Sequence, residues 1–177
     1  MGYFYRRFSG DSLNKIYELL EDATPCRFDC GVLCGAACCK GGDRDGMILF
    51  PGERDFFAGK PGFTIRRNYA YGYEYLVCGG TCERDDRPLS CRIYPYFFYV
   101  AENSSVVAAP DVRAPGHCPL ARRDAALSRL FLRRMRMCAK AIREDPDLYA
   151  FVRGLSDAFT DLGPLGSIAR EDNGIVK

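Results

Sequence analysis

The sequence contains no long hydrophobic run. Nowhere do about eighteen apolar residues follow one another, which is the length that a membrane-spanning helix needs. The N-terminal residues MGYFYRRFSGDS also lack the apolar segment that a secretory signal requires. We therefore expect a chain that does not cross a membrane and that is cytoplasmic.

Neither sign of charge is in large excess. The 177 residues include 25 Lys and Arg against 23 Asp and Glu, which gives a formal net charge of +2. A chain so close to neutrality has no overall attraction for nucleic acid or for a membrane surface. Nucleic acid is therefore not an expected partner.

Common catalytic motifs are also absent. The chain has no GxSxG, no Walker phosphate loop, no GxGxxG after a strand and no HExxH. With one histidine, a Cys–His nucleophilic pair would have to use His117, and nothing around that residue supports such a pair. Neither C-x-x-C nor the C-x3-C-x2-C run of radical SAM enzymes occurs, which weakens a redox or radical reaction. Whether the chain is an enzyme stays open.

Cysteine, in contrast, is abundant. Ten cysteines are present, and all but Cys138 fall between residues 26 and 118. Five of them lie in the stretch CRFDCGVLCGAACC, from Cys26 to Cys39. In a reducing cytoplasm, thiols at this density indicate metal binding more often than disulfides. For Cys26 alone, a role as a small buried residue competes with metal binding.

The spacing within this stretch is four residues, repeated from position 26 to position 38. Side chains four apart share one face of a helix, with Cβ atoms about 5–6 Å apart, so neighbouring thiols could share a metal. Gly31 and Gly35 interrupt the stretch, and glycine weakens a helix by about 1 kcal/mol relative to alanine. We expect turns and short helical pieces here, where the glycines permit positive φ angles.

A second motif lies downstream, in the run RPLSCRIYP from Arg87 to Pro95. Together with CGAACC at 34–39 and the pair Cys78 and Cys82, it resembles a family of zinc- or iron-chelating cysteine-cluster domains, with the pattern R-P-x-x-C-R-x-Y-P and a final cysteine. The likeness covers about residues 26–118, with Cys118 as the last cysteine. The first cysteine motif here is one residue longer in each gap than the family pattern, and Cys26 has no counterpart in it.

The resemblance implies a bound zinc or iron, the latter in the form of an iron–sulfur cluster such as 4Fe-4S. The ligand candidates are the thiols between residues 30 and 118: Cys30, Cys34, Cys38, Cys39, Cys78, Cys82, Cys91 and Cys118. They suffice for one four-thiolate site or for two. Which of Cys26, Cys30 and Cys34 are ligands is open. A flagellin lysine methylase carries a similar cysteine-rich segment, so the resemblance also brings in an enzymatic alternative.

Three charged residues in or before the motif allow two interpretations each. Arg87 and Arg92 flank Cys91 and could offset the negative charge of thiolates, or could pair with the adjacent Asp85 and Asp86. Glu53 is the acidic residue that we considered for function in the preceding segment, although a solvated carboxylate in the first turn of a helix is the simpler interpretation.

We expect an α+β fold in a single domain, 1–177. It comprises an N-terminal helix over 11–22, a cysteine-rich metal-binding core over 26–118 that is small and irregular, and a helical extension over 119–162. Most helices thus lie at the C-terminus.

Aromatic and β-branched residues predict short strands within the core. We expect one over 47–50, one or two over 63–77, and a hairpin from 94–100 and 105–109. If 63–77 were continuous, its tyrosines at 69, 71, 73 and 75 would share one side of a strand.

The helical extension carries a basic face. Arginine and lysine lie opposite an apolar stripe, at positions 122, 123, 129, 133, 134, 136, 140 and 143. Such a face could bind an acidic protein partner, with the metal serving only as a structural staple, or could simply be solvated. No aromatic residues alternate with the arginines, as a base-stacking surface would require.

Overall fold

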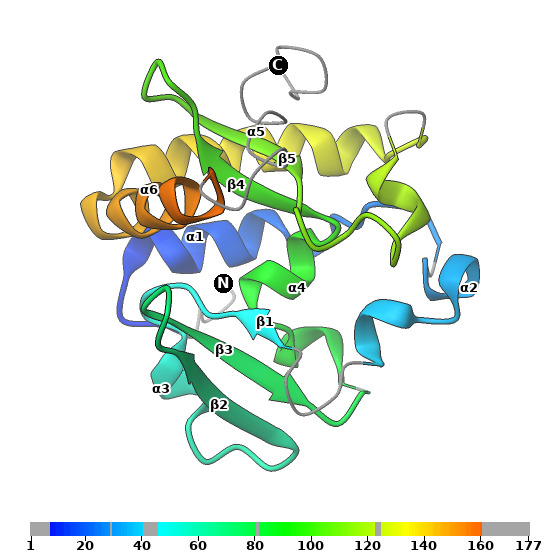
Figure 1. Ribbon diagram of the computed structural model, residues 1–177. Helices are drawn as coiled ribbons and strands as arrows, with labels where there is room; N and C mark the ends of the chain where they lie inside the picture. Colours follow the sequence, from blue (N-terminus) through cyan, green and yellow to red (C-terminus); the bar gives the residue numbers. More distant parts are fainter. Residues whose placement is uncertain (1–7, 29, 41–45, 81, 123–124, 161–177) are drawn as a thin grey trace, which may run out of the picture.

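The computed structural model describes residues 8–28, 30–40, 46–80, 82–122 and 125–160. The fold is α+β, as predicted, with two small antiparallel sheets and the two longest helices at the C-terminal end (Figure 1). Within the described residues, no helix is both long and apolar enough to cross a membrane.

The larger hydrophobic core is built by three helices and one hairpin. Helix α5 packs against α1, α6 and β5, and α6 covers β4 (Figure 1). Helical periodicity buries Phe131, Met135 and Ile142 of α5, whereas the neighbouring Leu130 is 40% exposed. The elements of this part are α1 (Asp11–Leu19), β4 (Tyr96–Val100), β5 (Val106–Pro110), α5 (Arg129–Glu144) and α6 (Pro146–Thr160).

A second, smaller cluster of Leu49, Phe57 and Leu76 lies under the three-stranded sheet. The strand order is β1-β3-β2, with Ile48 paired to Tyr75 and Phe63 paired to Cys78. The elements here are β1 (Met47–Ile48), α3 (Arg54–Phe57), β2 (Phe63–Asn68) and β3 (Tyr73–Cys78). Since β3 ends at Cys78, this sheet delivers a thiol directly to the edge of the molecule.

The remaining elements are short, and they carry Cys34, Cys38, Cys39 and Cys91. Helix α4 lies between the upper core and the sheet, and α2 lies at the far edge of the molecule (Figure 1). These elements are α2 (Gly31–Cys34), η1 (Ala37–Cys39), η2 (Arg84–Asp86), α4 (Leu89–Ile93) and η3 (Pro119–Ala121).

Several element predictions are confirmed and others need correction. The hairpin β4–β5 and the strands within 63–77 form as expected. Tyr69 and Tyr71, however, lie in the turn between β2 and β3, because the segment is a hairpin and not one strand. Helix α5 begins only at Arg129, so Arg122 is not part of its basic face, and Arg123 lies outside the described residues.

Glu53 is not a solvated carboxylate, and that interpretation is wrong. Its side chain is fully buried. The carboxyl accepts hydrogen bonds from the Tyr17 hydroxyl of α1, from Phe50 N at 2.6 Å and from Leu89 N at 2.7 Å. Burial raises the pKa of Glu53 to about 7, although these three donors act in the opposite direction. Glu53 thus joins α1, the segment after β1 and the first turn of α4.

Replacing Glu53 with Gln tests this network. Gln keeps one acceptor oxygen, so one of the two backbone N–H groups loses its partner, which costs about 1–3 kcal/mol. The titration of Glu53 adds a pH dependence. The native carboxyl keeps its proton up to a pH of about 7, whereas an unfolded one releases it near pH ~4.3. The stability that Glu53 contributes is therefore complete below the pKa of the unfolded state, and it is lost as the pH rises through the pKa of the native state.

We expect the wild-type free energy of unfolding to exceed that of Glu53→Gln most at about pH 4.5, and progressively less towards about pH 8. Urea unfolding across this range measures the difference. Asp55→Asn is the matched control, because Asp55 is an exposed carboxylate of the same short helix. A wild-type advantage that grew with pH would contradict the assignment.

Candidate metal centre

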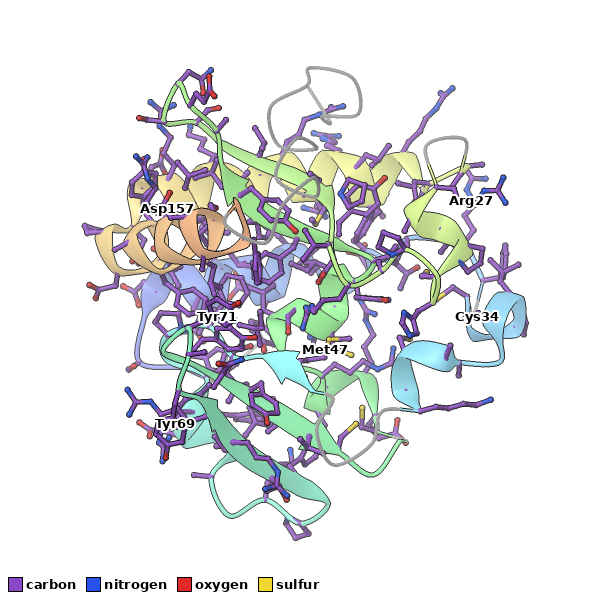
Figure 2. The ribbon with its side chains drawn as sticks, in the orientation of Figure 1. Arg27, Cys34, Met47, Tyr69, Tyr71 and Asp157 are labelled. Atoms are coloured by element: carbon purple, nitrogen blue, oxygen red, sulfur yellow. The ribbon has the colours of Figure 1, made fainter. Side chains whose placement is uncertain are left out.

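The segment from Cys26 to Cys39 folds into short helical pieces, as predicted. Helix α2 ends at Gly35, and both Gly35 and Ala36 adopt the left-handed region, with φ of 59° and 56°. This reversal separates α2 from η1, which carries the vicinal pair Cys38 and Cys39 with sulfurs 4.0 Å apart. Figure 2 places Cys34 at the outer edge of the molecule.

A close backbone approach brings the second cysteine segment against the first. Gly80 follows β3 with φ of 92°, and a Cβ at this position would lie only 2.9 Å from the carbonyl oxygen of Cys39. Only glycine accommodates both the dihedral angle and the contact. Gly80 therefore sets how closely the Cys78–Cys82 segment can approach Cys39.

The run from Arg87 to Pro95 has a structural role at nearly every position. Leu89 N donates to Glu53, and the Ser90 hydroxyl donates to the carbonyl of Ile48 at 2.6 Å. Arg92 is 3% exposed, lies 4.7 Å from the centre of the Tyr17 ring and donates to backbone carbonyls of the preceding loop. These contacts fix α4, and with it Cys91.

The two flanking arginines have different surroundings, one beside an aspartate and the other beside the thiols. Arg92 forms an ion pair with Asp85 at 3.7 Å. Asp86 instead pairs with Lys60. Arg87 faces the thiols, donating a hydrogen bond to the Cys82 sulfur and lying close to Cys91. Burial lowers the pKa of Arg87, but Cys91 and Cys82 outweigh that effect and raise it.

Three of the predicted ligands, Cys39, Cys82 and Cys91, lie near Arg87. Cys82 lies near Cys78 and Cys39, and Cys91 lies near Cys82 and Cys39, close enough for their charges to interact. Each thiol comes from a different place: η1, the end of β3, the following loop and α4. We call Cys39, Cys78, Cys82 and Cys91 the inner thiols.

The other predicted ligands extend outward from this group. Cys38 lies near Cys39 and also near Cys30 and Cys34, whereas Cys118 lies near Cys34. Cys26, which the sequence left ambiguous, is 5% exposed and lies near Cys118. Cys138 is buried in the larger core, away from these thiols, which agrees with its place on the apolar stripe of α5.

The surroundings of Cys38 and Cys91 favour the neutral form of each thiol. Burial, followed by the neighbouring thiols, raises the pKa of Cys38 to about 12, and burial raises the pKa of Cys91 well above its usual range. A metal binds the thiolate, so loading such a site releases protons and becomes more favourable as the pH rises.

No three His, Cys, Asp or Glu side chains of the described residues converge tightly enough to hold a metal ion as they stand. All ten cysteines are described and none is in a disulfide. The donor set nonetheless fits a soft metal, because it consists of thiols. One orphaned group fits as well: Arg87 Nε is buried and has no hydrogen-bond partner in the described part of the chain.

A pocket of about 600 Å³ adjoins the inner thiols. Cys38, Cys39 and Cys78 line one side of it, and Met47, at the centre of Figure 2, lines it from β1. The sequence did not predict this pocket, because its walls come from segments far apart in the chain. The cysteine motifs and the RPLSCRIYP run contribute Cys38, Cys39, Cys78 and Tyr94, but Arg67 and Arg113 lie outside them.

The glycine contact predicts an asymmetric pair of variants. Gly80→Ala should lower the free energy of unfolding by about 1–3 kcal/mol, because it adds an overlap with Cys39 and strains a positive φ. Gly79→Ala is the matched control, since a Cβ there meets no atom within 4 Å. Thermal unfolding of both variants measures the difference. Equal stability of the two would show that the approach of Gly80 to Cys39 is not a tight one.

Comparison with known proteins gives no assignment. No family model, no curated protein and no solved structure matches the chain. The resemblance of the cysteine motifs to zinc- or iron-chelating domains therefore stays a prediction.

Proposed function

We propose that this protein binds a metal, either zinc or iron in an iron–sulfur cluster, through its clustered cysteines. The observation that carries the proposal is that the inner thiols come from four separate places in the chain and lie near one another, three of them also near Arg87. Free cysteines bury readily for packing alone, but packing does not account for three thiols beside one guanidinium. A thiolate site accumulates negative charge, which Arg87 would offset.

The inner thiols would supply one complete four-thiolate site. Cys30, Cys34, Cys38 and Cys118 would supply further ligands, with Cys26 beside them, so a second site is within the capacity of the chain. Zinc held by four thiolates would act as a structural staple, whereas an iron–sulfur cluster would supply electron transfer. A cytoplasmic location fits this proposal, because a reducing compartment keeps the thiols free.

Metal content tests the proposal directly. Protein purified without oxygen should contain stoichiometric zinc and be colourless, or contain iron with sulfide and be brown. The double variant Cys82→Ala/Cys91→Ala should lose the metal of the inner-thiol site, because it removes two of its four ligands. That is all of the metal if the chain holds one site and half of it if the chain holds two. Elemental analysis and a visible spectrum of the same samples make the measurement.

Cys138→Ala is the control, because it removes a buried thiol outside the cluster and should keep its metal. Wild-type protein without metal would overturn the proposal. Full metal content in the double variant would overturn the assignment of the inner thiols.

A second candidate function is recognition of an acidic protein by α5. Its solvent face exposes Arg129, Arg133, Arg136, Lys140 and Arg143, together with Leu130 and Met137, each 40% exposed. Exposed apolar residues among cations favour a docking face over a merely solvated one. Arg134, in contrast, is partly buried and lies 4.0 Å from Asp22, so it does not belong to this face.

Charge reversal tests this face. Arg133→Glu/Arg136→Glu should abolish binding of poly-glutamate at low salt, and added salt should weaken binding by the wild-type protein, because the attraction is between exposed charges. The same reversal at Lys15 and Arg66, which are exposed on other elements, is the control. Light scattering or calorimetry measures the binding. Unchanged binding by the α5 variant would exclude this function for the helix.

A further inference from the structure

The pocket beside the inner thiols has properties that metal binding does not explain. Its volume of about 600 Å³ lies within the ~300–1,000 Å³ typical of small-molecule sites. Its walls come from η1, from all three strands of the first sheet, and from the segments at Tyr94 and at 113–117. A site assembled from so many segments is fixed by the fold itself.

Among the described residues that line the pocket, the charges are of one sign. Lys40, Arg67 and Arg113 contribute cations, and no Asp or Glu is among the lining residues that the structure describes. Lys40 and Arg67 are exposed, and the Arg67 guanidinium lies 5.8 Å from the centre of the Tyr69 ring at the rim. The pocket therefore favours a negatively charged occupant.

Arg113 is held in a defined orientation. Its Nε and Nη2 donate to the two carboxylate oxygens of Asp111 at 2.9 and 2.5 Å, and Nη1 donates to the carbonyl of Gly46 at 3.3 Å. A guanidinium has five N–H groups, so one remains on each terminal nitrogen. The Asp111 side chain is 2% exposed, whereas that of Arg113 is 33% exposed. Asp111 thus positions Arg113 and leaves two N–H groups for a ligand.

Aromatic rings supply the rest of the lining. Tyr73 and Tyr75 contribute from β3, Tyr94 from the end of α4 and Tyr69 from the rim. Asn68 donates to the Tyr73 hydroxyl at 3.1 Å, which fixes that ring. Burial, and then the charge of Asp111, raises the pKa of Tyr94, so its phenol stays a neutral hydrogen-bond donor. Such walls suit a planar group.

We propose that this pocket binds a small organic anion, in which a carboxylate or phosphate contacts Arg113 and a planar ring packs among the tyrosines. Paired N–H groups of arginine suit both kinds of head group. The alternative is that Arg113 only neutralises the buried Asp111. That role does not require a partly exposed guanidinium in a cation-lined, aromatic pocket.

The position of the pocket gives the ligand a place relative to the metal. Because Cys38, Cys39 and Cys78 line it, a bound anion would lie beside the thiols proposed to hold the metal. That placement rests on the proposed function, whereas anion binding itself does not.

Calorimetry with two pairs of probes tests the proposal. Each pair shares a ring and differs in charge: adenosine 5′-monophosphate with adenosine, and indole-3-acetate with indole-3-acetamide. We expect at least one anion to bind with a dissociation constant below 1 mM and at least tenfold more tightly than its neutral partner. The pair that binds tells a phosphate ligand from a carboxylate ligand. Binding of neither anion, or equal binding of anion and neutral partner, would overturn the proposal.

Variants locate the site. Arg113→Lys keeps the ion pair to Asp111 but loses the paired N–H groups, and should weaken binding of the anion at least tenfold. Arg67→Gln removes an exposed cation that does not hold the fold together, and should weaken it severalfold. Arg66→Gln is the matched control, because Arg66 is the preceding, equally charged and exposed residue of β2 but does not line the pocket. Equal effects of Arg66→Gln and Arg67→Gln, with none from Arg113→Lys, would place binding elsewhere.

Metal content measured on the same protein separates this proposal from the proposed function. Anion binding by protein that is purified without metal would support the anion site and overturn the proposal of metal binding. Stoichiometric metal without anion binding would support metal binding and overturn the anion site.

Discussion

The buried carboxyl of Glu53 is the constraint on which the position of the cysteines depends. It receives hydrogen bonds from α1, from the segment after β1 and from the first backbone N–H of α4. Arg84 adds a second tie, since it donates to carbonyls of Leu20, Glu21 and Ala23 at the end of α1. Together these contacts fix the loop and helix that carry Cys82 and Cys91 to the larger core. Burying a carboxyl costs free energy unless each of its hydrogen-bond partners is in place, so this network tolerates little movement.

The inner thiols therefore lie outside the larger hydrophobic core and are held against it. Phe97, Phe98 and Phe131 fill the larger core, which needs no thiol except Cys138. Arg87 lies between this core and the cysteines, and its orphaned Nε is buried at the boundary. Leaving a buried cationic donor unsatisfied costs free energy, which a thiolate or sulfide acceptor would recover. The arrangement is consistent with a site completed by a negatively charged centre.

Much of the fold was predictable from local pattern. Alternation and turn residues located the hairpin β4–β5, and helical periodicity located α5 and α6, because both depend on neighbours in sequence. Glu53 was misjudged because its burial depends on Tyr17 and Leu89, which lie 36 residues away on either side. The pocket was missed for the same reason, since no spacing reveals that Arg113 faces η1. The density of the cysteines revealed the candidate ligands, but only the structure separates the inner thiols from the other cysteines.

The separation of core and thiols has a consequence for how metal binding and folding are coupled. In many small metal proteins the metal decides whether the chain folds at all, because no other core exists. Here the helices and the hairpin bury their own apolar surface, and most cysteines lie outside that core. Burial raises the pKa of Cys38 and of Cys91, so these two thiols are neutral without a metal. A metal held as proposed would bind their thiolates, whose negative charge Arg87 would offset. Metal binding would therefore stabilise the cysteine segments on a core that folds from its own apolar side chains, and loss of the metal would leave that core in place.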